Sequence, residues 1–357
     1  MKIITWMLIR MVAMRFIAIL AGVSIFVLSL ETVSHSPEIL ALRPDSASIA
    51  FEYILYRSPG TLATFLPISM LLAMLLTLTE LSYRNEVAAL WAVGLSPTRI
   101  IALLMPLALL AGGLHFLLTD TGIPATEPTL REWGIGDYSK EKLKVGEKDP
   151  IWLRSGTDIV RAGGANPEST LLKDVIIFRR EPDGLLREQI FANSAALTDG
   201  RWLLRGAVVY YRGNEPPNRM DTLVYSGTMK PAAAGARSGD PQAMSLADLG
   251  YFIDNQGFGI RPVWAYQTWW HKRVSLFFSA LLMISLCLPL VTRFRRGGGL
   301  GILFVAGVGL GFLYFVVDGV ALTIGELGFV TPWLAAWLPV AGFGMLAVAL
   351  TLRAETV

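Results

Sequence analysis

Six long apolar stretches alternate with polar segments along the chain and form two groups of three, separated by a polar insert of about 150 residues. Each stretch approaches the ~20 apolar residues that an α-helix needs to cross ~30 Å of hydrocarbon. Six such stretches are too many for one soluble domain, so the pattern predicts an α-helical polytopic membrane protein. The stretches cover residues 16–30, 62–79, 100–118, 274–292, 300–324 and 329–352.

The insert, residues 120–265, has the composition and turn signals of β structure. Runs of β-branched and aromatic residues are separated by Pro182-Asp183-Gly184 and Asp199-Gly200, which favour turns. Several short strands of this kind predict a sandwich, jellyroll or barrel-like β domain. A short amphipathic helix is expected at Ser245–Asn255. The predicted strands are 151–153, 174–178, 185–196, 202–211 and 223–225.

Positive charge is unevenly distributed among the segments that flank the spans. With the N-terminus inside, the short outer loops 31–61 and 325–331 carry only Arg43 and Arg57, against nine basic residues on the inner side. Inner flanks of membrane helices are enriched in Lys and Arg, so both termini are predicted to be cytoplasmic and the insert to lie outside. The nine are Lys2, Arg10, Arg15, Arg84, Arg99, Arg293, Arg295, Arg296 and Arg353.

The first stretch resembles a secretory signal because basic residues precede it. It is followed by Leu30-Glu31-Thr32-Val33 rather than by a small-x-small cleavage site. We therefore expect it to remain as an uncleaved first membrane helix.

The polar link between the second and third stretches contains an apolar stripe at helical spacing. Arg84 and Glu86 lie off this stripe, Gly94 is placed to cap the helix C-terminus, and Ser96-Pro97 supplies an N-cap and first-turn proline for the third span. This helix either rests on lipid head groups or couples the protein to a cytoplasmic partner. The stripe consists of Tyr83, Val87, Leu90, Trp91 and Gly94.

Small and charged residues in the last three spans invite two interpretations each. Gly307 and Gly311 form a GxxxG pair, for which packing within the chain is the simpler explanation. Asp318 is a candidate functional acid near the outer end of its span, or a hydrated or paired one. Lys272 and Arg273 begin the fourth span on its outer side, either as interfacial anchors or as ligands for lipid phosphates.

The sequence offers little support for other chemistries. It contains no Gly-Lys dipeptide and hence no P-loop, and its three histidines, His35, His115 and His271, lack metal-ligand spacing. No G-x-S-x-G occurs, and the net charge of +3 is too small and scattered to indicate nucleic acid binding. The single cysteine, Cys287, excludes an intrachain disulfide and is expected to be a small apolar residue. A membrane enzyme is therefore disfavoured.

Three blocks of sequence together resemble the lipopolysaccharide export permease family, LptF and LptG, over nearly the whole chain. The first block, similar to the second helix and coupling helix, contains Phe65-Leu66-Pro67, Arg84-Asn85-Glu86-Val87 and Ala92-Val93-Gly94-Leu95-Ser96. The second, similar to jellyroll strands, contains Ile151-Trp152, Asp174-Val175 and Gly200-x-Trp202-x-Leu204. The third, which looks more like LptG than LptF, contains Gly311-Phe312, Tyr314, Asp318, Gly328, Pro332, Ala335-Ala336-Trp337 and Pro339.

The resemblance implies six transmembrane helices with a periplasmic β-jellyroll between helices three and four. Residues 1–119 would hold helices one to three with a coupling helix at about 81–95, residues 120–265 the jellyroll, and residues 266–357 helices four to six. The implied partners are LptF, an LptB ATPase dimer, LptC and LptA-type jellyroll proteins. The complex would extract lipopolysaccharide from the inner membrane, with ATP bound only on the partner subunit and no cofactor in this chain.

The resemblance also implies two sets of site residues. ATPase coupling is expected from Arg84, Glu86, Val87, Trp91 and Gly94, and lipid binding from Arg131, Lys272, Arg273 and Asp318. The chain departs from the family where lysines often follow the first helix, because Glu31, Thr32, Val33 and Ser34 stand there. The family also has two arginines three residues apart. Arg131 matches the first, but Gly134 stands at the position of the second.

Other functions fit the layout less well. An LptF-type subunit of the same complex is the nearest alternative. Lipoprotein-release and macrolide-efflux permeases have four helices with the outer domain after the first, which the three-and-three layout contradicts. A membrane-anchored periplasmic receptor or enzyme would leave the coupling-type helix without a role.

Overall fold

The computed structural model describes residues 2–43, 48–92, 94–138, 151–165, 170–181, 184–198, 200–213, 216–227, 240–254, 261–293 and 300–355. The chain divides into two compact units. We call Met1–Ile123 together with Thr268–Val357 the membrane unit, and Pro124–Gln267 the β unit. These divisions fall a few residues from the boundaries expected from the sequence.

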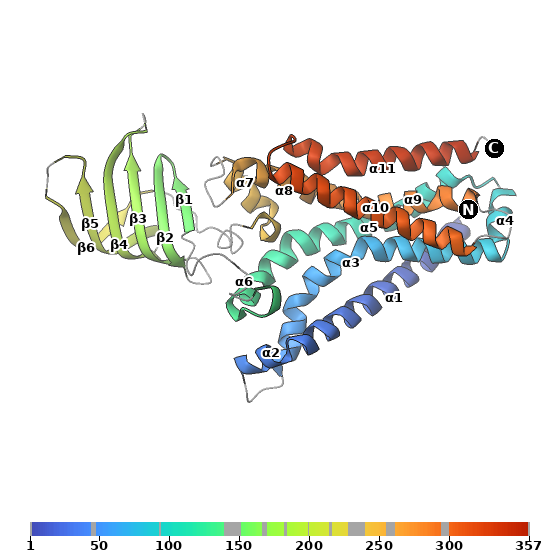
Figure 1. Ribbon diagram of the computed structural model, residues 1–357, viewed down its shortest axis with the longest axis horizontal. Coiled ribbons are helices and arrows are strands. Elements are labelled where there is room, and N and C mark those ends of the chain that lie inside the picture. The colour runs from blue at the N-terminus through green and yellow to red at the C-terminus, as the bar shows by residue number, and fades with distance from the viewer. Residues whose placement is uncertain are drawn as a thin grey trace. The chain divides into compact units, whose positions relative to one another are not determined.

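Six helices within the described ranges are long and apolar enough to cross a membrane, which confirms the six predicted spans. They lie alongside one another in Figure 1. The third span continues without a break through a π-turn into α6, and the fourth is interrupted by a 3₁₀ turn. The spans are α1 (Lys2–Ser34), α3 (Ser48–Tyr83), α5 (Pro97–Leu117) with η1 (Leu118–Gly122) and α6 (Ile123–Trp133), α8 (Val263–Ser275) with η5 (Leu276–Phe278) and α9 (Ser279–Arg293), α10 (Leu300–Glu326), and α11 (Pro332–Glu355).

The helix α3 forms the centre of the membrane unit. Its Leu71 and Leu75 are at most 1% exposed, and two glycines of α10 lie directly against them. A Cβ at Gly307 would come within 2.6 Å of Leu75, and one at Gly311 within 2.5 Å of Leu71. The GxxxG pair therefore serves close packing within the chain, as the simpler interpretation held. Cys287 of α9 is completely buried in the same core.

The β unit is built on one six-stranded antiparallel sheet in which each strand pairs with its neighbours in sequence. The predicted strands are found, and β2 was missed by the sequence analysis. Gly184 and Gly200 have left-handed φ angles of 88° and 74°, as their predicted turns require, although residues 182–183 and 199 lie outside the described ranges. The strands are β1 (Ile151–Ser155), β2 (Asp158–Ala165), β3 (Leu171–Arg180), β4 (Leu186–Thr198), β5 (Arg201–Tyr211) and β6 (Asn218–Tyr225).

The sheet curls upon itself and encloses its own core (Figure 1). Strands β2 and β6 are separated by three others, yet the Tyr225 hydroxyl donates to the Asp158 carboxylate at 2.8 Å. The Arg179 guanidinium lies over the Tyr225 ring, 5.7 Å from its centroid. Burial raises the pKa of Tyr225, so its hydroxyl stays protonated and keeps this bond. The inward side chains, including Ile177 and Leu204, are completely buried.

The β unit also contains the predicted amphipathic helix, α7 (Leu246–Asp254). Ser245 caps the start of this helix through two hydrogen bonds with Asp248. The Ser245 hydroxyl donates to the Asp248 carboxylate at 2.7 Å, and the Asp248 amide donates to the Ser245 hydroxyl at 3.2 Å. Leu249 and Phe252 form the buried face of the helix. The predicted position of Asn255 lies outside the described residues.

Candidate functional site

The link between α3 and α5 contains a short helix, α4 (Glu86–Ala92), bounded by two left-handed residues. Asn85 has a φ of 56° and Gly94 a φ of 83°. Asparagine tolerates this conformation better than other residues with a side chain, and glycine adopts it freely. α4 is therefore shorter than the expected helix at about 81–95, because Asn85 breaks the helical path and Tyr83 belongs to α3 instead.

The C-terminal end of the link carries both caps that the sequence predicts, one for α4 and one for α5. The Leu95 amide donates to the Leu90 carbonyl at 3.1 Å and the Gly94 amide to the Trp91 carbonyl at 2.9 Å, which together make a Schellman motif. The Ser96 hydroxyl then accepts from the Arg99 amide at the start of α5, where Pro97 occupies the first turn. The orientation of α4 is thus set by local hydrogen bonds at its C-terminal side.

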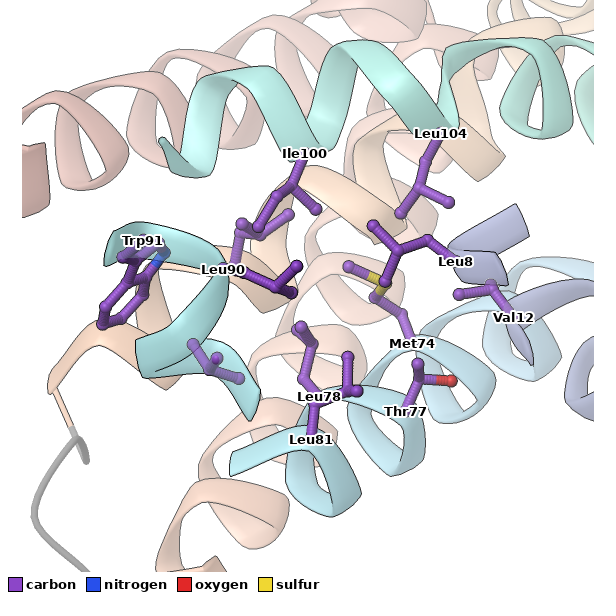
Figure 2. A pocket seen from close by; sticks show the side chains of 12 residues that line it. Leu8, Val12, Met74, Thr77, Leu78, Leu81, Leu90, Trp91, Ile100 and Leu104 are labelled. Atoms are coloured by element: carbon purple, nitrogen blue, oxygen red, sulfur yellow. The ribbon is translucent and has the colours of Figure 1, made fainter. Parts of the chain in front are cut away.

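One face of α4 packs against the rest of the membrane unit, and we call this contact the seat of α4. Val87 is 6% exposed and Leu90 is 9% exposed. Figure 2 shows Leu90 pointing from α4 toward Leu78 and Leu8, while Trp91 lies at the margin. The cavity between them has a volume of only about 10 Å³, the lower limit for a single water molecule. The seat is a packed contact and not a ligand pocket.

This seat changes the roles expected for two of the coupling residues. Val87, which the sequence analysis assigned to ATPase coupling, packs within the chain and helps to hold α4 in place. Trp91 also lines the seat and is only partly exposed. The surface left for a partner is formed by Tyr83, which is 78% exposed, by Arg84, and by Ala89, with Glu86 half-buried at its side. The assignment of this segment to ATPase coupling stays a prediction.

A second polar region lies where α8, α10 and the third span meet. Lys272 of α8 is 6% exposed, and its ammonium lies 2.5 Å from the Asp318 carboxylate of α10. Asp318 is therefore paired, and Lys272 does not reach out to head groups as an interfacial anchor would. A buried lysine needs such a partner because an unpaired charge is costly to remove from water.

Arg273 is even more deeply buried, at 2% exposed, and donates to the Thr119 carbonyl of η1. The π-turn explains why this carbonyl is available. The Ile123 amide bonds to Leu118, five residues back, and the next residue, Pro124, has no N–H for Thr119. Arg273 supplies the missing donor, so the interfacial-anchor interpretation is wrong for this residue too.

Further hydrogen bonds extend this region across the third and fourth spans. His115 of α5 is 4% exposed, and its Nδ1 lies 2.9 Å from the Ser279 hydroxyl of α9. The Thr119 hydroxyl donates to the His115 carbonyl at 2.8 Å. Gly112 lies so close to Phe277 that any Cβ there would overlap the Phe277 carbonyl oxygen. We call Lys272, Asp318, Arg273, Thr119, His115 and Ser279 the buried network.

The remaining lipid-binding candidate, Arg131, belongs to the β unit. Its guanidinium donates to Glu127 at 2.7 Å and lies 3.7 Å from Asp240. The C-terminal end of α1 carries Glu31, which accepts from Arg57 at 2.7 Å. Lipid binding by Arg131, Lys272, Arg273 and Asp318 stays a prediction, and a phosphate would have to compete with the chain's own carboxylates for Arg131 and Lys272.

Sequence reasoning missed the partners of these cations. Glu127, Thr119 and Glu31 looked like ordinary helical or loop residues, and only their positions in space give them a role. A signal was present for Glu127, which stands four residues before Arg131, the spacing of an intrahelical ion pair. Across the described residues, no three His, Cys, Asp or Glu side chains are grouped so that they could hold a metal ion.

Comparison with known proteins agrees with this architecture. The model of the family described as lipopolysaccharide export system permease LptF/LptG matches residues 6–353. The lipopolysaccharide export system permease protein LptG of Haemophilus influenzae is 23% identical over 270 residues, which cover 73% of each chain. The protein of the same name from Escherichia coli K12 is 21% identical over 306 residues, which cover 84% of each chain.

Proposed function

Because the chain belongs to the LptF/LptG family of lipopolysaccharide export permeases, we propose that it is an LptG-type subunit that moves lipopolysaccharide out of the inner membrane. The observation that carries the proposal is the order of elements along the chain. Three spans precede the strands of the β unit and three follow them, and α4 lies between the second and third spans. A subunit of this kind has a membrane path for lipid, a β unit that receives it, and a contact for an energy source.

The direction of transport follows from the proposed orientation. Nine basic residues flank the spans on the side of α4, and the short loops 31–61 and 325–331 on the opposite side carry two, which supports a cytoplasmic α4 and a periplasmic β unit. Exposed positions permit a test. Ser226→Cys in the β unit should react with an impermeant thiol reagent in intact spheroplasts, and Ala89→Cys on α4 only after permeabilisation. Cys287 is fully buried and should stay silent. The reverse labelling pattern contradicts the orientation.

The energy for transport must come from outside this chain. A lipid with several acyl chains is held in a bilayer by about 0.8 kcal/mol for each buried CH₂, so its extraction does not occur spontaneously. We propose that a cytoplasmic LptB dimer hydrolyses ATP and contacts the exposed surface around the start of α4, at Tyr83, Arg84 and Glu86. Apolar and charged side chains on one short helix give such a contact both area and register.

The β unit is proposed to receive the lipid and to pass it on. Its inward side chains form an apolar face. If a partner domain added a strand to one edge of the sheet, this apolar face would continue into the partner. Within the described strands, β1 and β6 each pair on one side only, so each offers a row of main-chain groups for strand addition. LptC and LptA-type jellyroll proteins would be the partners on this side, and an LptF subunit the partner in the membrane.

Co-purification tests the assembly directly. The tagged chain, solubilised from its native membrane in mild detergent, should bring down a second six-span subunit and an ATPase in fixed ratio. Replacing Tyr83 and Arg84 together by alanine should remove the ATPase and leave the second subunit, because only the exposed surface next to α4 is changed. Isolation of the unmodified chain without an ATPase would contradict the proposal.

A further inference from the structure

The helix α1 packs on α3 along one face, and much of its remaining surface is exposed. Only 28% of its most apolar window is buried, against 67% for α3. Two ion pairs of opposite polarity join it to α3. Near one end the Glu31 carboxylate accepts from Arg57, and toward the other the Arg15 guanidinium donates to Glu80. These two ion pairs join α1 to α3 in addition to the apolar packing of Leu8, Val12, Phe16 and Leu20.

The second of these pairs is shared with the link to α4. One oxygen of the Glu80 carboxylate accepts from Arg15, and the other lies 2.8 Å from the Arg84 guanidinium. Two cations thus use one carboxylate. The side chains are only partly covered, because Arg15 is 26%, Glu80 33% and Arg84 62% exposed. Arg15 additionally has one guanidinium nitrogen, Nη1, that is covered and forms no hydrogen bond within the described residues.

Arg84 stands at the point where a displacement of α4 must be absorbed. It follows the last residue of α3 and precedes the left-handed Asn85. Beyond it, Val87 and Leu90 of α4 are buried in the core of the membrane unit, and Figure 2 shows Leu90 among the side chains of that core. A partner that engages the exposed Arg84 would remove it from Glu80. The carboxylate would then serve Arg15 alone, which strengthens the attachment of α1 to α3.

We infer that Glu80 is a positioning residue that couples the state of α4 to the position of α1 by distributing one carboxylate between Arg84 and Arg15. The inference rests on the proposed function, because it identifies how contact with the ATPase would reach a membrane helix. Such coupling requires an element with two arrangements that both sites bias. The carboxylate with two competing cations is that element.

The test uses the reconstituted complex of the full chain with its ATPase and partner subunits, and compares lipid transferred per ATP hydrolysed. Glu80→Gln should lower this ratio about fivefold while hydrolysis stays within about twofold, since coupling free energies of this kind correspond to factors of at least about five. Arg15→Gln should have the same effect, and the double variant should be no worse than either single one. Arg15→Lys, which keeps the charge, should restore most of the ratio.

The matched control is Glu52→Gln. Glu52 forms an ion pair with Arg43 at 3.2 Å, with similar exposure of the carboxylate, but joins no segment to α4. It should leave the ratio unchanged. The inference is overturned if Glu80→Gln leaves the ratio intact, or if it lowers hydrolysis and transfer together with a reduced melting temperature. Failure of the unmodified complex to transfer lipid at all would instead contradict the proposed function.

Discussion

Two charged regions of the membrane unit use similar side chains under different conditions. In the buried network, Lys272 and Arg273 are at most 6% exposed, and each is matched to a partner on another span. At the α4 link, Glu80 and Arg84 are partly exposed, and one carboxylate serves two cations. A buried pair cannot be broken without leaving a charge in an apolar medium, whereas a half-exposed pair exchanges partners at low cost. The first region therefore fixes spans together, and the second permits movement.

The largest effect is expected from breaking the buried pair. Asp318→Asn leaves the Lys272 ammonium buried without a counter-ion, which should destabilise the membrane unit by about 3–5 kcal/mol. The melting temperature in detergent, followed by intrinsic fluorescence, should fall sharply. The double variant Lys272→Met with Asp318→Leu should restore much of it, because apolar residues can replace a buried pair. If Asp318→Asn melts like the unmodified protein, the pair is not a fixed structural element and the comparison fails.

A smaller effect is expected at the end of α4. Gly94→Ala forces a side chain into a left-handed conformation and should cost about 1–2 kcal/mol. The substitution destabilises α4 and not α3. Hydrogen exchange of the backbone amides of residues 86–92 should therefore accelerate, while that of α3 stays unchanged. Asn85→Gly, at the other end, should be nearly neutral because glycine adopts the same φ without strain. Equal exchange rates in Gly94→Ala and the unmodified protein would show that the cap does not hold the helix.

The smallest effect on stability is expected from Glu86→Ala. Its side chain is only half-buried, so the free energy of unfolding should fall by less than about 0.5 kcal/mol and the melting temperature should change little. Association with the ATPase should nevertheless weaken, because the carboxylate stands beside the exposed face of α4. Affinity measured between the detergent-purified subunits checks this. Unchanged association and transport would favour a helix that rests on head groups.

Local signals in the sequence were reliable where the structure depends on neighbouring residues. The six spans follow from apolar length, and the caps at Gly94 and Ser96 follow from short-range hydrogen bonding. The strand β2 was missed because its sequence, Asp158–Ala165, ends in two alanines and two glycines, which rarely indicate a strand. Asn85 was missed as a helix break because asparagine only sometimes adopts the left-handed conformation.

The candidate site was less predictable because its meaning depends on distant partners. Lys272 and Asp318 are 46 residues apart, so the sequence could not show that these two candidate lipid ligands form an ion pair with each other. Val87 had the spacing of an anchor, but periodicity cannot show whether an apolar face packs on the chain itself or on a partner. Glu80 stands four residues before Arg84, the same spacing as Glu127 and Arg131, but this spacing could not show that Arg15, 65 residues away, shares the carboxylate.

ATP-dependent lipid release tests the central claim most directly. Proteoliposomes that contain the complete complex and fluorescent lipopolysaccharide would be mixed with a soluble jellyroll acceptor, with and without ATP. The proposed function predicts transfer to the acceptor only when ATP is hydrolysed, and its loss when Tyr83 and Arg84 are replaced by alanine. Transfer that proceeds equally without ATP, or hydrolysis by the complete complex with no transfer of lipid, would contradict a permease that moves lipopolysaccharide at the expense of ATP.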